Sequence, residues 1–302
     1  MSVLKIIYVT ETEDTCDIIK RIVLKIKCFF NIIYKENVEE KIIYKLPIFS
    51  SEKISNNKVN KLSKRIIKKL ENDGIYSVAL SKYLSTLQNL KNNFYSENIN
   101  ILDGRFLFKC LTFEVIEYIL KRKNKKIQES EIYLLVNDFN NINKELIIYI
   151  AKSVKKLNIV TNHINKCKDI ENYLYNEFGI LLNIINNKKT SISNSEIILN
   201  FDFPEEVLNK YKIYRKAIIV NFQEKVSIQC KKFNGININY FKTNIPKKYK
   251  LQGFKDEEIY ESIIYKKDLY SIKKMITEDK IRIRRLIGNN GCIMDREYID
   301  KL

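Results

Sequence analysis

The chain has 302 residues, of which 45% are hydrophobic and 11% aromatic. This composition fits one large or two ordinary globular domains and excludes a disordered polymer. Basic residues exceed acidic ones by 54 − 36 = 18, an imbalance that can attract nucleic acid or another polyanion. The cations are spread along the chain, however, and the abundance of Lys, Asn and Ile fits an AT-rich coding bias. Solvated surface charge is therefore favoured over one binding stripe.

The cysteines and the N-terminus bear on metal binding and location. The six cysteines are scattered without a CxxC pair, and the chain has one histidine, so we predict no metal site and interpret the thiols as small buried hydrophobic groups. The opening MSVLKIIYVTETEDT turns acidic after a short apolar run, which indicates a strand and not a secretion signal. Four cations interrupt the apolar stretch 18–33, so it does not span a membrane. A reduced, cytoplasmic location is expected.

The first hundred residues alternate strands and helices. A basic amphipathic helix at 57–70 ends at the stop signal Asn72-Asp73-Gly74, and the helix at 14–30 has apolar residues at helical spacing. Alternation of this kind predicts a mostly parallel sheet covered by helices, here an N-terminal α/β lobe at 1–104. The expected strands are 3–9, 42–48, 75–80 and 99–102, and the expected helices 14–30, 57–70 and 82–95.

A strongly apolar helix at 106–121 follows the first lobe. Because it is apolar around most of its girth, we expect it to lie buried between two layers. It ends in the basic run KRKNKK, and we interpret 105–127 as a connecting helix between two lobes.

A second α/β unit is predicted at 128–225, as a doubly wound parallel sheet. The next residues, VSIQCKKFNGININYF, alternate on both sides of Asn234-Gly235, which predicts a β-hairpin near 226–241. With a helix at 257–276 and the strand KIRIRRLI, residues 226–302 are expected to pack back on the lobes. The expected strands of the second unit are 132–136, 158–161, 180–184, 196–199 and 217–221, and its helices are 143–156, 167–178 and 204–211.

Three stretches of the second unit carry a family resemblance. They are the strand, turn and helix that begin with EIYLLVNDFNN, the run VTNH at 160–163 with the helix KCKDIENYLYNEFG, and SEIILNFDFP at 195–204. In order and spacing, residues 131–222 resemble the nucleotide-binding domain of the shikimate dehydrogenase and glutamyl-tRNA reductase group. The resemblance implies a Rossmann fold that binds NAD or NADP, with Asn162 and His163 beside the ribose.

The turn after the first strand departs from that family, because Asn137-Asp138-Phe139-Asn140-Asn141 contains no glycine. Glycines allow the tight turn and let the pyrophosphate approach the backbone amides. We expect Phe139 to stand where the phosphates would lie. Asp138 would also repel them, at a cost of about 4 kcal/mol for a pair at ~4 Å. No cofactor is therefore expected.

Candidate site residues can still be named. If NADP or NAD binds, Asp138, Asn140, Asn141, Asn162 and His163 are the residues that would hold it. The family's catalytic lysine and aspartate are not visible. The candidates are therefore polar residues near predicted strand ends, namely Lys82, Asp103 and Arg105.

These candidates have simpler interpretations. Asp103 is favoured as a turn or helix-cap residue, and His163 as a surface residue. Gly288-Asn-Asn-Gly291 resembles the GxxG loop that clamps nucleic-acid backbones, but the alternating IRIRRLI before it favours a hairpin turn.

Three functions follow from these patterns. The favoured one is a non-catalytic or regulatory cytoplasmic protein on a degenerate Rossmann scaffold. The alternative is an active NAD(P)-dependent oxidoreductase with an atypical phosphate loop, and the third is a basic nucleic-acid-binding protein. The partner stays unknown; an anionic partner (nucleic acid or a phosphorylated ligand) and a homo-oligomer stay open.

Overall fold

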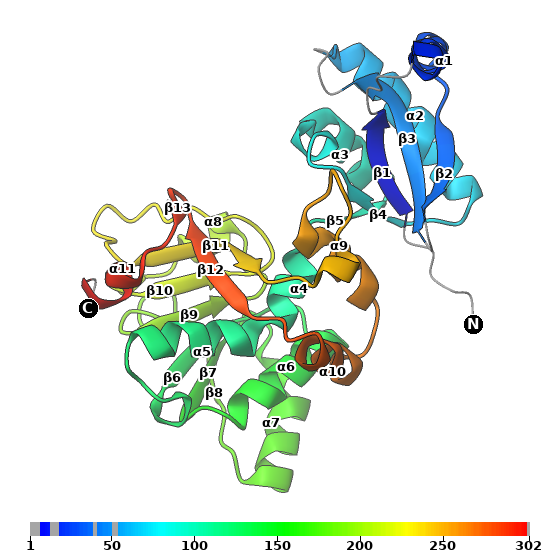
Figure 1. Cartoon of the computed structure of the whole chain (residues 1–302). Coiled ribbons are helices and arrows are strands. Elements are labelled where there is room, and N and C mark those ends of the chain that lie inside the picture. The colour runs from blue at the N-terminus through cyan, green and yellow to red at the C-terminus, as the bar shows by residue number, and fades with distance from the viewer. Residues whose placement is uncertain (1–6, 13–17, 39–40, 50–53, 301–302) are drawn as a thin grey trace. The chain divides into compact units, whose positions relative to one another are not determined.

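The computed structural model describes residues 7–12, 18–38, 41–49 and 54–300, so the first residues of the predicted strand 3–9 and helix 14–30 lie outside it. The chain divides into two compact units, 1–104 with 245–265 and 105–244 with 266–302. Both are α/β (Figure 1). The predicted C-terminal range 226–302 is divided between them, because residues 245–265 belong to the first unit.

The first unit contains a five-stranded sheet in the order β2-β3-β1-β4-β5. All its pairs are parallel except β2 with β3, and β2 is a strand that the sequence analysis missed. The strands are β1 Ile7–Thr12, β2 Tyr34–Val38, β3 Lys41–Phe49, β4 Ser77–Leu80 and β5 Asn100–Leu102. The α-helices are α1 Ile18–Phe29, α2 Asn56–Asn72, α3 Gln88–Ser96 and α9 Asp256–Ile264, with short 3-10 turns at Leu84–Thr86 and Lys247–Tyr249.

Helix α2 supplies much of the first unit's core. The side chain of Ser55 caps its first turn by accepting from the amide of Lys58 at 3.3 Å, and Gly74 follows its end with φ 69°. Its apolar face packs into the same cluster as residues of β1, β3 and β4. The buried apolar residues of α2 are Val59, Leu62, Ile66, Ile67 and Leu70.

The second unit contains an eight-stranded sheet in the order β13-β12-β11-β10-β9-β6-β7-β8. Six strands from β8 to β11 are parallel and follow the order 3-2-1-4-5-6 of dinucleotide-binding sheets, which confirms the predicted Rossmann-like fold. Strands β12 and β13 extend it in antiparallel fashion. The strands are β6 Glu131–Leu135, β7 Lys156–Val160, β8 Asn183–Ile185, β9 Ile197–Asn200, β10 Ile218–Asn221, β11 Ile236–Thr243, β12 Ile283–Gly288 and β13 Gly291–Cys292.

Two predicted helices are each divided in the structure. The apolar helix at 106–121 is two helices that meet at Leu111, and the predicted helix 257–276 is α9 and α10, separated by Lys266 with φ 62°. A positive φ ends a helix because it places the backbone outside right-handed geometry. The α-helices of the second unit are α4 Arg105–Cys110, α5 Thr112–Arg122, α6 Asn141–Ala151, α7 Ile164–Phe178, α8 Glu205–Leu208, α10 Leu269–Glu278 and α11 Asp295–Asp300, with a 3-10 turn at Ile127–Glu129.

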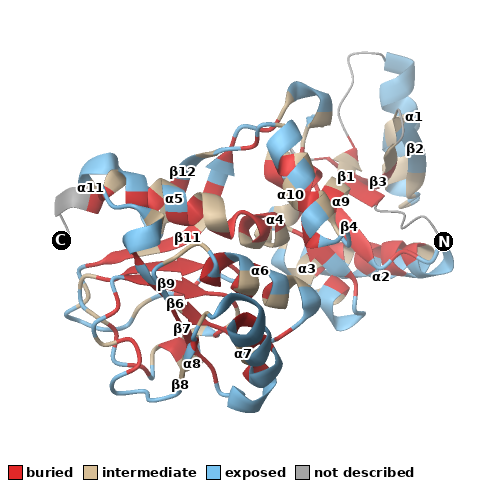
Figure 2. Cartoon of the chain, turned by 90° about the horizontal axis from the view of Figure 1, so that it is seen from below, coloured by how far each residue is buried: buried red, intermediate tan, exposed pale blue. Residues whose placement is uncertain are grey.

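The sheet of the second unit is buried on both faces. Figure 2 shows its central strands as buried. One face packs against α8 and the segment that contains Val226. At the carboxyl end of the sheet Phe108 of α4 stacks on Phe241 with ring centroids 4.6 Å apart, and it also contacts Phe222. This burial explains why the strands are continuous apolar runs.

The predicted hairpin near 226–241 is wrong. In the described segment before Gly235 no strand forms, and β11 instead pairs parallel with β10 and antiparallel with β12. Gly235 is needed for a close approach and not for a turn, because a Cβ there would lie 2.1 Å from the carbonyl oxygen of Ala217. The alternation was therefore that of one strand and a covering loop.

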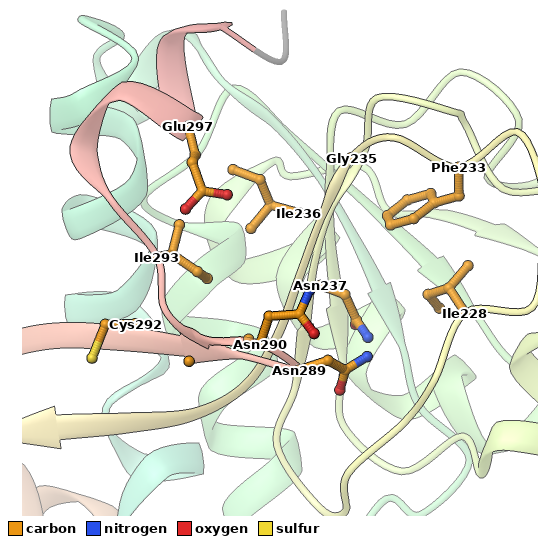
Figure 3. A pocket seen from close by; sticks show the side chains of 12 residues that line it. Ile228, Phe233, Gly235, Ile236, Asn237, Asn289, Asn290, Cys292, Ile293 and Glu297 are labelled. Carbon is orange, nitrogen blue, oxygen red and sulfur yellow. The ribbon is translucent and has the colours of Figure 1, made fainter.

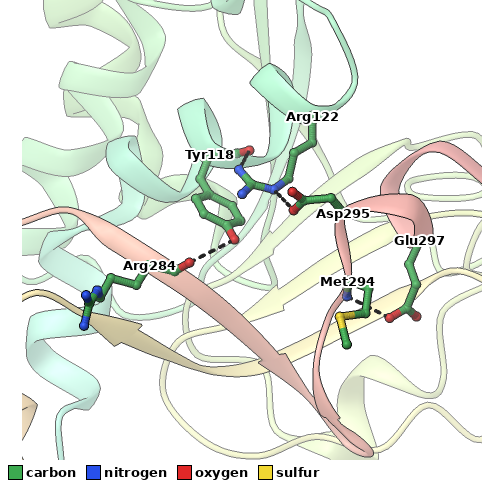
Figure 4. A network of polar contacts seen from close by, with 6 residues as sticks. All are labelled: Tyr118, Arg122, Arg284, Met294, Asp295 and Glu297. Carbon is green, nitrogen blue, oxygen red and sulfur yellow. Dashed lines mark hydrogen bonds and ion pairs between the residues drawn. The ribbon is translucent and has the colours of Figure 1, made fainter.

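A polar network attaches the C-terminal helix α11 to α5 (Figure 4). Arg122 donates to Asp295 at 2.6 Å, and its guanidinium lies 3.4 Å from the ring centroid of Tyr118. The hydroxyl of Tyr118 donates to the carbonyl of Arg284 on β12 at 3.3 Å. The added antiparallel strands are thus held against the parallel sheet within the second unit.

Candidate functional site

The candidate site lies at the carboxyl ends of β6 and β9 in the second unit. These adjacent strands are paired in parallel, with Leu134 opposite Leu199. In the strand order of this sheet, the chain leaves β6 toward β7 on one side and reaches β9 on the other. Open α/β sheets bind ligands at this switch point, where the first turn presents its amides to phosphate.

In this chain the side-chain carboxylate of Asp202 accepts hydrogen bonds from the amides of this turn. The amide of Asn137 donates to Oδ1 of Asp202 at 2.7 Å, and the amide of Asp138 donates to Oδ2 of the same residue at 2.7 Å. Asp202 lies two residues after the end of β9, so the strand next to β6 delivers it to the turn. Bidentate binding of this kind is how backbone amides hold an anion.

Asparagine side chains form hydrogen bonds with the rest of the turn. Asn140 caps α6 by accepting from the amide of Asn143 at 2.9 Å, and it donates to a carboxylate oxygen of Asp138 at 2.7 Å. The side chain of Asn143 donates to the carbonyl of Asp138 at 2.6 Å. These bonds let asparagines stabilise the turn without the glycines that a phosphate loop contains.

A lysine and two carboxylates set the electrostatics of the turn. Burial raises the pKa of Asp202, while the amides of Asp138 and Asn137 and the charge of Lys109 act in the opposite direction. Burial lowers the pKa of Lys109, against the attraction of Asp202 and Asp138. The ammonium group also lies 5.5 Å from the ring centroid of Phe201. The half-buried carboxylate therefore already has a cation of its own.

The residue that bonds to the turn amides is not one that the sequence predicted there. Phe139 is only 9% exposed, so its ring is packed within the protein. Asp138 is exposed, as an anion that any incoming diphosphate would meet. Asp202, which the sequence analysis did not name, holds the two amides. Its only sequence signal is its place two residues after the strand IILN.

The remaining predicted cofactor residues lie at or near this turn. The amide of Asn162 donates to Oδ1 of Asn137 at 2.8 Å, and the amide of His163 donates to Thr161 Oγ1 at 3.0 Å. The side chains of Asn141, Asn162 and His163 are exposed. The structure thus brings β6 and β7 loop residues together, while their role toward a dinucleotide stays a prediction.

A buried asparagine network extends along the same edge of the sheet. Asn200, Asn221 and Asn239 lie on β9, β10 and β11 and are at most 3% exposed. Asn200 Nδ2 donates to Asn221 Oδ1 at 3.0 Å, and Asn221 Nδ2 donates to Asn239 Oδ1 at 3.0 Å. Asn239 then donates to Oδ1 of Asn289 at 2.7 Å. The sequence analysis missed this network, although ILN, IVN and ININ place amides in apolar strands.

The predicted catalytic residues are divided between the two units. Arg105 belongs to the second unit, where its Nη1 donates to the carbonyls of Asn239 at 2.7 Å and Asn221 at 3.2 Å. Lys82 and Asp103 belong to the first unit. Lys82 is exposed after β4, and Asp103 directly follows β5. Arg105 thus stabilises the strand ends, and a catalytic role for any of the three stays a prediction.

The GxxG segment is the turn between β12 and β13, which confirms the favoured hairpin interpretation. It lines a pocket of about 250 Å³ with Phe233 and Ile228 on one side and Ile293 on the other (Figure 3). The lining is apolar or amide except for Glu297, and these described residues offer a nucleic-acid phosphate no cation. The pocket therefore lacks the chemistry of a backbone clamp.

Within the described ranges, no three His, Cys, Asp or Glu side chains are grouped so that they could hold a metal ion. In the same ranges, no helix has the length and apolar character needed to cross a membrane. Of the five described cysteines, Cys110 and Cys167 are buried, as predicted, but Cys230 and Cys292 are exposed, so the interpretation as buried hydrophobic groups is wrong for these two.

Comparisons with known proteins identify no relative by sequence. No protein-family model matches the chain, and no curated protein does. Among solved structures, the L-tryptophan dehydrogenase of Nostoc punctiforme is 9% identical with a TM-score of 0.37, and the match covers 89% of this chain and 78% of that one. The A chain of Bacillus subtilis dipicolinate synthase is 9% identical with a TM-score of 0.36, over 92% of this chain and 99% of that one.

A third solved structure, the quinate dehydrogenase of Corynebacterium glutamicum in complex with NAD, is 7% identical with a TM-score of 0.24, over 65% of this chain and 70% of that one. These similarities establish neither a family nor an activity. The Rossmann-like assignment of the second unit depends on its own strand order.

Proposed function

We propose that this chain is a non-catalytic or regulatory protein built on a Rossmann-like scaffold that has stopped binding dinucleotides. One observation carries the proposal: Asp202 accepts the two turn amides that a pyrophosphate would require, at 2.7 Å each. The protein thereby supplies its own anion in place of a cofactor phosphate.

Magnitudes support this proposal. Hydrogen bonds to a charged group contribute roughly 1.5–3 kcal/mol each, so displacing Asp202 from both amides costs about 3–6 kcal/mol. The exposed carboxylate of Asp138 adds about 4 kcal/mol of repulsion for a phosphate at ~4 Å. A ligand of micromolar affinity has about 8 kcal/mol of binding free energy in total. The cost of displacing Asp202 and the repulsion by Asp138 together are about as large as the binding free energy of a micromolar ligand.

Calorimetric titration of the full chain with NAD, NADH, NADP and NADPH tests the proposal. We expect no measurable binding at millimolar ligand. A thermal-shift series gives a second reading, because ligand at 100 times its dissociation constant would add about 2.7 kcal/mol to the free energy of unfolding. Micromolar affinity for any of the four would overturn the proposal.

A variant tests the physical cause separately. Asp138→Asn combined with Asp202→Asn removes both negative charges at the turn and keeps the side-chain sizes. If these carboxylates exclude anions, the double variant gains affinity for inorganic pyrophosphate that the unchanged chain lacks. Asp169→Asn combined with Glu177→Gln, two exposed residues of α7, is the matched control for the same change of net charge. Equal pyrophosphate binding by the original chain and the double variant would contradict the assigned cause.

A further inference from the structure

Helix α1 of the first unit has an apolar face that lies exposed among the described residues. None of its twelve residues, all of them described, is buried (Figure 2). Isolated apolar residues on a surface are ordinary, but a continuous row of large ones indicates an interaction site. The row comprises Ile18, Ile19, Ile22, Val23, Ile26 and Phe29, which are 44–81% exposed.

The geometry of α1 shows that this row points away from the first unit. At about 100° per residue the six side chains occupy an arc of about 140°. Leu24, Lys27 and Cys28 lie on the opposite side of the helix and are the half-buried ones. The ammonium group of Lys27 lies 4.1 Å from the ring centroid of Tyr34 on β2. The helix is therefore attached by one side and displays the apolar side.

Cations border the apolar row. By the same angular spacing Lys25 lies beside one edge of the row and Lys20 beside the other, and both are exposed. Arg21 and Lys27 complete four basic residues in the helix, and the sequence from Ile18 to Lys35 contains no acidic residue. The helix ends in an aromatic pair, Phe29 and Phe30, with ring centroids 5.2 Å apart and both rings exposed.

We propose that α1 binds to the surface of a membrane that contains anionic lipids. A helix in the interface plane inserts its apolar side among the acyl chains, while flanking lysines extend to the phosphate groups. With twelve residues α1 is about 18 Å long, too short to span the hydrocarbon core. It therefore lies parallel to the surface and carries the protein with it.

Charge decides between a bilayer and a second copy of this chain. Two copies of α1 packed through their apolar rows would bring the basic edges of one helix toward those of the other, and the twelve residues of the helix include no acidic one. An anionic lipid surface supplies the opposite charge along both edges of the row. The inference is independent of whether the second unit binds a dinucleotide.

Co-sedimentation of the full chain with vesicles tests this inference. We expect binding to phosphatidylcholine vesicles that contain roughly one third phosphatidylglycerol, and little binding to pure phosphatidylcholine. Ile22→Glu with Ile26→Glu should weaken binding at least about tenfold, because both changes place a carboxylate on the inserted side. Both positions are more than half exposed, so folding, followed by circular dichroism, is expected to be unchanged.

Leu181→Glu is the matched control, since Leu181 is a 75% exposed apolar residue of the second unit. Its vesicle binding should equal that of the unchanged chain. Absence of binding to anionic vesicles, or equal binding by the α1 variant, overturns the inference. A dimer in size-exclusion chromatography that the α1 variant converts to a monomer also overturns it, because a second copy would then cover the face.

Discussion

Helices α1 and α2 have the same sequence character. Both are basic, both place apolar residues on one side, and both belong to the first unit. Helix α2 buries its apolar residues against the sheet, whereas α1 buries none. Periodicity in a sequence reports that a helix has an apolar face, but it does not report what covers that face. In the second unit, asparagine side chains likewise differ in burial: Asn221 is buried and Asn162 is exposed.

The largest expected effect sharpens this comparison directly. Leu62 of α2 is fully buried, so Leu62→Ala should leave a cavity and lower the free energy of unfolding by about 3 kcal/mol. Ile22→Ala on α1 removes a 53% exposed side chain and should change it by less than about 0.5 kcal/mol. Urea unfolding followed by circular dichroism measures both. A comparable loss for Ile22→Ala would show that α1 is covered within the protein.

A smaller effect extends the comparison to amides. Asn221 is fully buried and its side chain bonds to Asn200, Asn237 and Asn239. Asn221→Ala leaves buried partners unsatisfied and should lower the free energy of unfolding by about 2 kcal/mol. Asn162→Ala, at an exposed residue of the same edge, should stay within about 0.5 kcal/mol. Equal losses in urea unfolding would mean that the buried network is not what stabilises this edge.

Local signals in the sequence predicted the elements well. The alternation of strands and helices predicted two mostly parallel sheets, Asn72-Asp73-Gly74 marked the end of α2, and the missing glycines marked an unusual turn at Asn137. Each of these features depends on residues close together in the chain. Short-range periodicity and turn chemistry are therefore enough to find them.

The features that define the site depend on distant residues. Asp202 reaches an amide 65 residues earlier in the chain, and the asparagine network joins three strands. The alternation around Gly235 fitted a hairpin, but β11 pairs with β10 because the missing side chain lets it approach Ala217. Pairings of this range follow from strand order, which no local pattern specifies.

The smallest expected effect is a change of stability with pH at Asp202, whose side chain is half-buried. Burial raises its pKa above the ordinary carboxyl value, although the amides of Asp138 and Asn137 and the charge of Lys109 oppose the change. Between the ordinary and the raised pKa the folded chain holds more protons than the unfolded one, so this carboxyl makes the free energy of unfolding fall as pH rises. Urea unfolding across that window should show the fall in the unchanged chain and lose it in Asp202→Asn. Glu196, whose pKa is lowered first of all by its hydrogen bond from Lys125, gives the opposite sign, so Glu196→Gln should remove a loss of stability at falling pH. If the unchanged chain instead gained stability relative to Asp202→Asn as pH rose, the amides and Lys109 would outweigh burial, and the turn would hold its internal anion more tightly than a half-buried carboxyl implies.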